Sequence, residues 1–257
     1  MSNIKVRIDE KLNQLFSFKR VGDWYRQGIC PNCGKKELYT HAINPRVVKC
    51  ARLNKCGYEE HVKEICEDLF KDWSKDFPRT KEQPNAAADA YLIHARGFNP
   101  ELLKGTYTQE LFRNDLKYPN EVTATIRFKI AEGVYWERFI DRPERFGRQK
   151  ANFIGKYEGL CWTLEDLDTL CNAQSIWMTE GIFNCIALSF SKQPSIATMS
   201  TSNFPSQILA QIWERCIQLK KSRPRLRWAF DNDKAGKKAI KKFHLRALQE
   251  KWDSTAA

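Results

Sequence analysis

Three acidic residues follow two apolar segments in the last third of the chain. Glu180 comes directly after SIWMT (175–179), and Asp231 and Asp233 come after LRWAF (226–230). Clustered carboxylates repel one another unless a cation neutralises them, and oxygen ligands of this kind suit Mg²⁺ or Mn²⁺. A metal ion held there can activate a hydroxyl group and stabilise charge on a transferring phosphoryl group. A plainer interpretation stays open, in which Asp233 caps the next helix and Glu180 lies in an ordinary turn.

Four cysteines in the first part of the chain have a spacing that suits a metal ion: Cys30, Cys33, Cys50 and Cys56. Two thiol pairs supply the four sulfur ligands of a tetrahedral Zn²⁺ site, and such a site stabilises a small domain directly. Glycine follows the second cysteine of each pair and permits the tight turns that point backbone NH groups at thiolates. The second pair has a wide gap, so His61 can replace Cys56, and four unrelated thiols are the remaining alternative.

The elements that would carry the acidic residues alternate along the last third of the chain. Three strand–helix units in a row predict a parallel sheet, because parallel strands need helical crossovers. Ligands bind beyond the carboxyl ends of such strands, so Glu180 and the two aspartates are expected to converge at one edge. The expected strands are 175–179, 195–199 and 226–230, and the expected helices are 182–190, 205–221 and 235–250.

The remaining segments differ in composition, and the fold class is α/β, or α+β for the chain as a whole. Apolar spacing predicts a short helix at 59–70 and another helix near 86–96. Alternating residues predict strands at 122–130 and 133–140, followed by an irregular basic stretch at 141–157. The expected domains are a zinc-ribbon DNA-binding domain (1–70), a linker (71–88), a basic subdomain (89–172) and the parallel-sheet subdomain (173–257).

The charge of the chain points to a polyanionic partner. The formal net charge is +12, and residues 220–246 alone carry eleven basic side chains against two acidic ones. Lys234, Lys237 and Lys238 directly follow the aspartates and are expected to attract phosphate groups. No apolar run is long enough for a membrane span, and the N-terminus lacks a signal-peptide pattern. We therefore expect a protein of the cytoplasm with no membrane partner.

A basic segment lies ahead of the predicted parallel sheet. Arginine binds phosphate through a planar fork and aromatic rings stack on bases, so this segment suits a nucleotide or a single strand. A solvated loop with hydrophobic anchors explains the same pattern equally well. The basic residues are Arg138, Arg142, Arg145, Arg148, Lys150 and Lys156, and they alternate with Phe139, Phe146 and Phe153.

Two stretches of the chain resemble the signature motifs of the TOPRIM fold: MTEGIFNCIAL (178–188) and FDNDKAGKKA (230–239). That fold is shared by bacterial-type DNA primases, type IA and II topoisomerases and some nucleases. The stretch ARLNKCGY (51–58) resembles the zinc ribbon of primases from phages and mobile elements. A ribbon, a linker, YLIHARGF (91–98) and then TOPRIM follow the order of bacterial and phage primases.

The resemblance implies roles for the acidic residues. Glu180 matches the catalytic glutamate of the family, which assists proton transfer, and Asp231 and Asp233 match its metal-binding pair. Together they are expected to bind Mg²⁺ or Mn²⁺. Where primases often carry an aspartate after the glutamate, this chain has Asn184, which keeps an oxygen ligand but removes one charge.

The resemblance also implies roles for basic residues. Arg138, Lys150 and Asn152 match a basic ridge that precedes TOPRIM in primases, and we expect them to hold the template backbone and incoming triphosphates. The full set expected to bind nucleotide or template is Arg138, Arg142, Arg145, Arg148, Lys150, Asn152, Lys234, Lys237 and Lys238.

The expected function is that of a DNA primase, which synthesises short RNA primers on single-stranded DNA by metal-dependent nucleotidyl transfer. Its expected partners are the template, NTPs and a replicative helicase, fused or separate. A TOPRIM nuclease would use the same acidic residues for hydrolysis, although a zinc ribbon argues against it. A topoisomerase is disfavoured because the chain has no room for strand-passage domains. A single-strand-binding accessory without activity is the non-enzymatic alternative, and Asn184 lends it some support.

Overall fold

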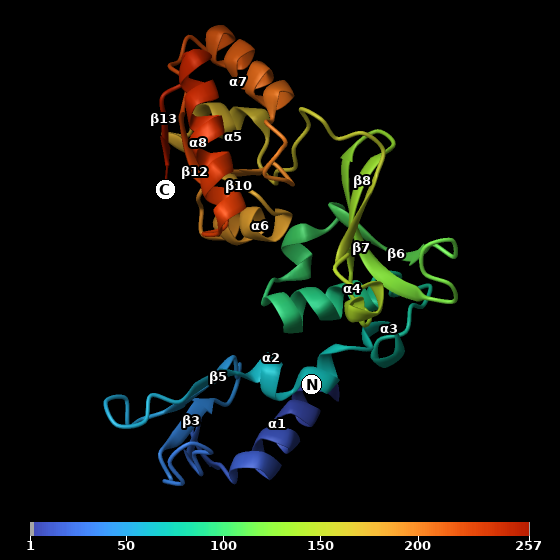
Figure 1. Cartoon of the computed structure of the whole chain (residues 1–257), viewed down its shortest axis with the longest axis vertical. Helices are drawn as coiled ribbons and strands as arrows, with labels where there is room; N and C mark the ends of the chain where they lie inside the picture. Colours follow the sequence, from blue (N-terminus) through green and yellow to red (C-terminus); the bar gives the residue numbers. More distant parts are fainter. Residues whose placement is uncertain (1–2, 257) are drawn as a thin grey trace. The chain divides into compact units, whose positions relative to one another are not determined.

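The computed structural model describes residues 3–256, which form two compact units. Unit 1 runs to Ala95 and includes Ile140–Arg142, and unit 2 comprises Arg96–Phe139 and the residues from Pro143 onward. The elements of both units are labelled in Figure 1. These units divide the chain at a different point from the domains expected from sequence, whose bounds stay a prediction.

Unit 1 is built on helix α1 (Asn3–Phe16) and a five-stranded antiparallel sheet. The helix buries Ile4, Ile8, Leu12 and Phe16, which recur every four residues and therefore form one stripe. Figure 1 shows α1 lying beside the sheet. The strands follow one another in order and are β1 (Lys19–Val21), β2 (Trp24–Gly28), β3 (Leu38–His41), β4 (Val47–Cys50) and β5 (Glu59–His61).

The helix expected at 59–70 begins later than the sequence predicted. Residues Glu59–His61 pair with β4 as an antiparallel strand, and Lys49 forms a 3.0 Å ion pair with Glu59 across the two strands. Strand pairing satisfies the backbone groups that the start of a helix would leave open. The helical part is then limited to α2 (Val62–Ile65) and the 3₁₀ turn η1 (Glu67–Phe70).

The segment expected as a linker packs within unit 1. It contains helix α3 (Trp73–Asp76), and the Trp73 indole is only 1% exposed, with ring contacts to Phe77 and Tyr91. Arg142 also binds Asp72 through two nitrogens at 2.6 and 2.7 Å. The helix expected near 86–96 is present as α4 (Ala86–Ala90), continued by a π-helical turn, η2 (Tyr91–Arg96).

Unit 2 contains two sheets, of which the first is antiparallel with its strands in sequential order. The two predicted strands are confirmed as β7 (Val122–Ala131) and β8 (Val134–Phe139), with β6 (Tyr107–Arg113) on the outer side of β7. The stretch 141–157 is less irregular than predicted. It contains a 3₁₀ turn, η4 (Pro143–Phe146), and strand β9 (Ala151–Ile154), which pairs with β8.

A buried carboxylate explains why β9 adds to this sheet. Glu137 on β8 is only 1% exposed, and it accepts a 2.7 Å hydrogen bond from Arg127 on β7 and a 3.1 Å bond from Asn152 on β9. A buried carboxylate requires such partners, because losing water without them is costly. Asn152, the one polar residue of this strand, therefore links β9 to β8.

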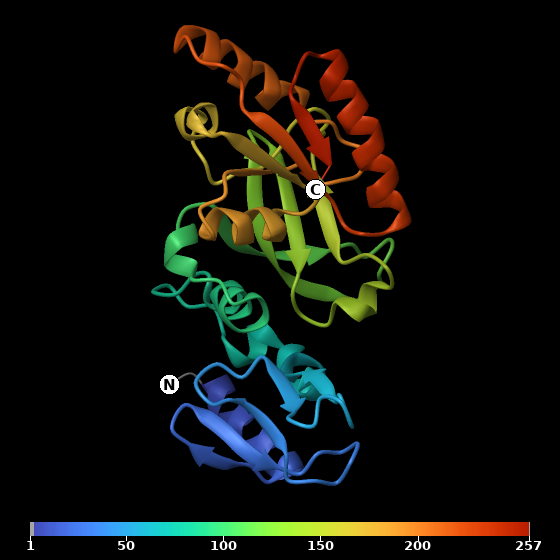
Figure 2. The same ribbon diagram turned by 90° about the vertical axis from the view of Figure 1, so that its left-hand side faces the viewer.

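The second sheet of unit 2 is parallel, with strand order β11-β10-β12-β13. The three predicted strands are confirmed as β10 (Ser175–Thr179), β11 (Ser195–Ala197) and β12 (Arg225–Ala229), and β13 (Ser254–Ala256) is an addition. The helices of this part are α5 (Leu167–Asn172), α6 (Ile182–Phe190), α7 (Ser206–Gln218) and α8 (Lys234–Gln249). Figure 2 shows α8, in red, running alongside the sheet.

Aromatic packing holds α8 on the parallel sheet. The Trp228 ring of β12 is fully buried and lies 5.4 Å from the Phe243 ring of α8, and Phe204 completes the cluster. Burying a large aromatic ring contributes roughly 1.5–3 kcal/mol relative to leaving it exposed. The predicted α/β class with a parallel sheet is thus confirmed.

Among the helices at residues 3–256, none has the length and apolar character needed to cross a membrane.

We predict that Arg127→Met destabilises unit 2, because it leaves the buried Glu137 carboxylate without its charged partner. The expected loss is about 3 kcal/mol in the free energy of unfolding, measured by urea denaturation. Lys129→Met on the same strand is the control, since its partner Glu132 is exposed and such pairs contribute little. Equal stability of the two variants would contradict the role given to Arg127.

Candidate functional site

The predicted acidic residues emerge from neighbouring parallel strands. Thr179 at the end of β10 is in register with Ala229 at the end of β12. Glu180 and Asp231 follow these two residues directly or nearly so, and both side chains line one pocket of about 190 Å³. The convergence predicted from the strand order is therefore present for Glu180 and Asp231. The residues that line the pocket are Trp136, Glu180, Gly181, Ile182, Asn184, Met199 and Asp231.

The pocket has a negative electrostatic character. Burial raises the pKa of the Glu180 carboxyl above its usual value, and the charges of Asp231 and Asp233 raise it further. The amide of Asn184 lies 3.5 Å from Oδ1 of Asp231 and donates toward it. A neutral amide at this position adds no further repulsion among the carboxylates. The pocket therefore holds a proton or a cation more readily than an isolated carboxylate would.

Asp233 has a structural role beside its predicted one. Its side chain accepts a 2.7 Å hydrogen bond from the backbone NH of Gly236 and caps the N-terminus of α8. The cap interpretation of the sequence is thus correct, and it does not exclude metal binding, because a carboxylate has a second oxygen. The cap also orders the turn that presents Asp231.

The donor set suits Mg²⁺ better than a metal that prefers sulfur or nitrogen. Glu180, Asp231 and Asp233 offer oxygen ligands, and Mg²⁺ commonly uses few carboxylates and keeps waters or substrate oxygens on its other positions. Among the described residues, only the cysteine cluster brings three or more candidate ligand atoms within 4.8 Å of one another. The carboxylate oxygens of the acidic group are therefore farther apart than the sulfur atoms of the cysteine cluster.

The four predicted cysteines come together in unit 1. Their sulfur atoms all lie within 4.8 Å of one another, with 3.7 Å between Cys30 and Cys56 and 3.9 Å between Cys33 and Cys50. Zinc bonds of about 2.3 Å in a tetrahedron place sulfur atoms about 3.8 Å apart, so the cluster fits Zn²⁺. His61 is exposed on β5 and is not part of the cluster, which leaves Cys56 as the fourth member.

The thiols differ in how readily they lose protons. Burial raises the pKa of Cys50 to about 12, whereas the backbone NH of Tyr58 lowers the pKa of Cys56 to about 7. An NH group aimed at sulfur is the arrangement that the Cys-Gly turns predicted, and Gly34 and Gly57 both have positive φ. Zinc would displace the remaining protons and stabilise the thiolates.

The residues of the predicted basic ridge lie on different faces of the antiparallel sheet. Side chains alternate along a strand, so Arg138 shares a face with Trp136, while Glu137 and its partner Asn152 lie on the opposite face. The Nε atom of Arg138 is buried and has no hydrogen-bond partner among the described residues. Lys150 is exposed just before β9.

Two of the predicted arginines bind carboxylates of the chain. Arg142, which belongs to unit 1, binds Asp72, and Arg145 lies 2.9 Å from Glu121. Partly exposed pairs of this kind are weak, so they compete with a phosphate ligand without preventing its binding. Arg148 is exposed, as are the three lysines in the first turns of α8: Lys234, Lys237 and Lys238. Binding of nucleotide or template by all these residues stays a prediction.

Sequence reasoning missed Trp136, Ile182 and Met199 as residues of the pocket. Met199 follows β11 at the carboxyl end of the sheet and has a φ of 67°, which is uncommon for a residue other than glycine. That position after a strand was a usable signal. Trp136 lies on a strand of the other sheet, and no local pattern links it to Glu180.

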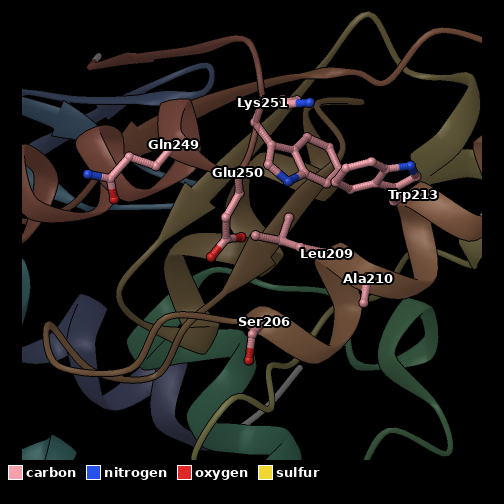
Figure 3. Close-up of a pocket in the computed structure, with 8 residues that line it drawn as sticks. Ser206, Leu209, Ala210, Trp213, Gln249, Glu250 and Lys251 are labelled. Carbon is pink, nitrogen blue, oxygen red and sulfur yellow. The ribbon is translucent and has the colours of Figure 1, made fainter.

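A second hollow lies away from the acidic residues. It has a volume of about 310 Å³ and lies between α7 and the end of α8. Figure 3 shows Leu209, Ala210 and Trp213 of α7 on one side and Glu250 and Lys251 on the other. The hollow does not include any of the residues predicted to bind metal, nucleotide or template.

Comparison with known proteins agrees with the interpretation of the acidic motifs. Residues 177–257 match the family model described as Toprim-like, and no curated protein matches the sequence. The C-terminal part of the chain is therefore similar to the Toprim-like family. The resemblance predicted from the motifs around Glu180 and Asp231 is confirmed for this part.

Three solved structures with 14% sequence identity also match. The primase fragment of the bacteriophage T7 primase-helicase protein has a TM-score of 0.40, with 89% of this chain and 87% of that chain covered. T7 primase domains bound to an RNA/DNA hybrid and dTTP have a TM-score of 0.31, with 63% and 76% covered. The RNA polymerase domain of Mycobacterium tuberculosis primase DnaG has a TM-score of 0.42, with 76% and 66% covered.

We predict that Glu180→Gln stabilises the metal-free chain at neutral pH. Because the pKa of Glu180 is raised in the folded state, the unfolded state releases this proton first. Wild-type stability therefore falls, relative to the variant, as pH rises from the unfolded pKa through the folded one. The measurement is thermal unfolding across pH 4–8 in buffer without divalent metal, with exposed Glu158→Gln as control. A wild-type chain that gains stability over the variant in this window would contradict the assignment.

We predict that Gly236→Ala disturbs the acidic edge. An added Cβ would lie 2.1 Å from the backbone oxygen of Asp231, so the turn before α8 must move. We expect a loss of about 1–3 kcal/mol in the free energy of unfolding, despite the better helix propensity of alanine. Gly181→Ala is the matched control, because a Cβ there meets nothing within 4 Å. Equal stability of the two variants would show that the turn yields freely.

Proposed function

We propose that this chain is a DNA primase that synthesises short RNA primers on single-stranded DNA. The observation that carries the proposal is the pairing of Glu180 and Asp231 in one pocket at the edge of the parallel sheet of a Toprim-like domain. In the reaction, the 3′-hydroxyl oxygen of one nucleotide attacks the α-phosphorus of the next. The bond to the β-phosphate oxygen breaks, pyrophosphate leaves, and the hydroxyl proton passes to a base.

The acidic residues supply the groups that this reaction needs. Asp231 and Asp233, with Glu180, would hold Mg²⁺ or Mn²⁺, which when bound neutralises charge on the transferring phosphoryl group. Burial and the neighbouring aspartates raise the pKa of Glu180, so its carboxylate accepts a proton more readily than an ordinary glutamate does. Asn184 contributes an amide in place of a charge. Its contact with Asp231 keeps that carboxylate oriented toward the pocket.

Basic residues of unit 2 would bind the phosphates. Arg138 lies on the same sheet face as Trp136, a residue of the pocket, and its buried Nε has no hydrogen-bond partner in the part of the chain that the structure describes. Arg138 is only half-buried, and a phosphate would bind the accessible part of its guanidinium, because charge-assisted bonds to arginine are strong. Lys150 is exposed and directly precedes β9, the strand that pairs with Arg138 on β8. The α8 lysines add positive charge that would attract a nucleic acid to the acidic edge.

The zinc ribbon would bind the template. The outer face of its sheet carries Trp24 opposite His41, with ring centroids 5.1 Å apart, and Tyr39 beside them at 6.0 Å from Trp24. The Arg26 guanidinium lies 5.6 Å from the Trp24 ring, which is 37% exposed. Exposed aromatic rings with neighbouring basic groups are the usual means of binding single strands. We infer that this face contacts the template and biases where synthesis starts.

This function requires the template and NTPs as substrates and a replicative helicase, fused or separate, as the partner that opens duplex DNA. It also requires the cytoplasm of a cell or of a phage-infected host as its location. The Mg²⁺ or Mn²⁺ of the acidic site and the Zn²⁺ of the cysteine cluster are the two metals of the proposal.

The test is a priming assay with single-stranded DNA, labelled NTPs and either Mg²⁺ or Mn²⁺. We predict short RNA products from the wild-type chain and a loss of at least about a hundredfold in Asp231→Ala, since a metal ligand contributes several kcal/mol to the transition state. Asp115→Ala, an exposed acid between β6 and β7, is the control and should retain activity.

The same assay separates the alternatives. Cleavage of the DNA that depends on Asp231 would identify a nuclease. Binding of single-stranded DNA with neither synthesis nor cleavage, under both metals and on a panel of templates, would identify an accessory protein without activity. Either result would overturn the primase proposal.

A further inference from the structure

Trp136 occupies a position in the acidic pocket for which metal binding offers no explanation. It lies on β8, opposite Phe128 of β7 and Phe153 of β9, in the antiparallel sheet of unit 2. Its indole nevertheless lines the same pocket as Glu180 and Asp231, which belong to the parallel sheet. An aromatic ring contributes no ligand to a magnesium ion, so its presence there requires another reason.

The indole is held firmly but is not sealed in a core. Its centroid lies 5.9 Å from the Phe128 ring and 5.7 Å from the Phe183 ring of α6, the latter in an edge-to-face contact. Such contacts restrict the rotation of the ring. Trp136 is only half-buried, whereas Trp228 in the sheet core is completely buried. Part of the ring therefore remains available to the pocket, and its orientation is determined before any ligand arrives.

The remaining lining of the pocket is of two kinds. Ile182 and Met199 are apolar, while Glu180, Asn184 and Asp231 are polar or charged. A ligand that satisfies both must carry a flat apolar part for the indole and an anionic part for a cation on the carboxylates. A nucleotide has both parts, joined by a ribose. The volume of about 190 Å³ suits one ring system rather than an extended strand.

We propose that Trp136 is the stacking surface for the base of the nucleotide whose phosphates are held at the acidic residues. The inference rests on the proposed function, because it assumes that triphosphates bind at Glu180 and Asp231. Stacking on an indole tolerates every base, since each base has a π-face. Trp136 would thus position any of the four nucleotides and leave the choice of base to the template. Arg138 lies on the same face of the sheet and is half-buried.

The test compares two ligands on the full chain in the presence of Mg²⁺. ATP carries both phosphates and a base, whereas inorganic tripolyphosphate carries phosphates only. Replacing Trp136 by leucine keeps an apolar side chain but removes the ring. We expect the affinity for ATP, measured by calorimetry, to fall by about 5- to 150-fold, which corresponds to about 1–3 kcal/mol for a stacked base. The affinity for tripolyphosphate should change less than about twofold.

Two further variants control the experiment. Trp213→Leu removes a partly exposed indole from the hollow shown in Figure 3 and should leave both affinities unchanged. Trp136→Phe retains a ring and should lose less ATP affinity than the leucine variant. If the leucine variant does not fold, the ATP affinities of Trp136→Phe and the wild type are compared instead, and equal affinities would contradict the inference. A 2-aminopurine nucleoside triphosphate, whose fluorescence falls on stacking, should be quenched by the wild-type chain and less by Trp136→Phe.

The outcomes distinguish this inference from the proposed function. If Trp136→Leu weakens both ligands equally, or neither, Trp136 does not bind the base and the inference is wrong. If the wild-type chain does not bind tripolyphosphate with Mg²⁺, or if Asp231→Ala leaves that binding unchanged, the acidic site does not hold phosphates. In that case the proposed function fails first, and the inference fails with it.

Discussion

The parallel pairing of β10 with β12 is the constraint on which the acidic site depends. It places the end of each strand at the same edge of the sheet, so that Glu180 and Asp231 line one pocket although they are far apart in sequence. The buried aromatic packing between Trp228 and Phe243 holds α8 against this sheet, and the cap formed by Asp233 determines where α8 begins. The aromatic packing and the helix cap therefore keep Glu180 and Asp231 close together, although their negative charges repel each other.

The acidic pocket lies in a chain whose net charge is positive. The charges of Asp231 and Asp233 help to raise the pKa of Glu180, and a cation or a proton relieves this repulsion. Asn184 limits this repulsion by placing an amide, rather than a fourth carboxylate, beside Asp231. The net charge of +12 acts at longer range and favours an anionic ligand over the metal alone.

Local patterns were sufficient to predict the parallel sheet, the acidic residues and the cysteine cluster. The signals for these features are local. Glu180 directly follows strand β10, and Cys30 and Cys33 are only three residues apart. Long-range pairing limited the rest. Glu59–His61 become a strand because β4 offers an edge, and β9 forms because Asn152 reaches Glu137 on the neighbouring strand. Arg142 and Asp72 are 70 residues apart in sequence, so only the folded chain brings them together.

Trp136 shows why the pocket as a whole could not be read from sequence. Glu180 and Asp231 come from the ends of strands of the parallel sheet, whereas Trp136 comes from a strand of the antiparallel sheet. The two sheets are in contact through the rings of Trp136 and Phe183, the latter on α6. A ligand bound there is in contact with groups from both sheets of unit 2. Arg138, two residues further along β8, lies on the same face as Trp136, and its buried Nε has no hydrogen-bond partner among residues 3–256. The antiparallel sheet therefore does more than support the parallel sheet, because it supplies Trp136 to the pocket that holds Glu180 and Asp231.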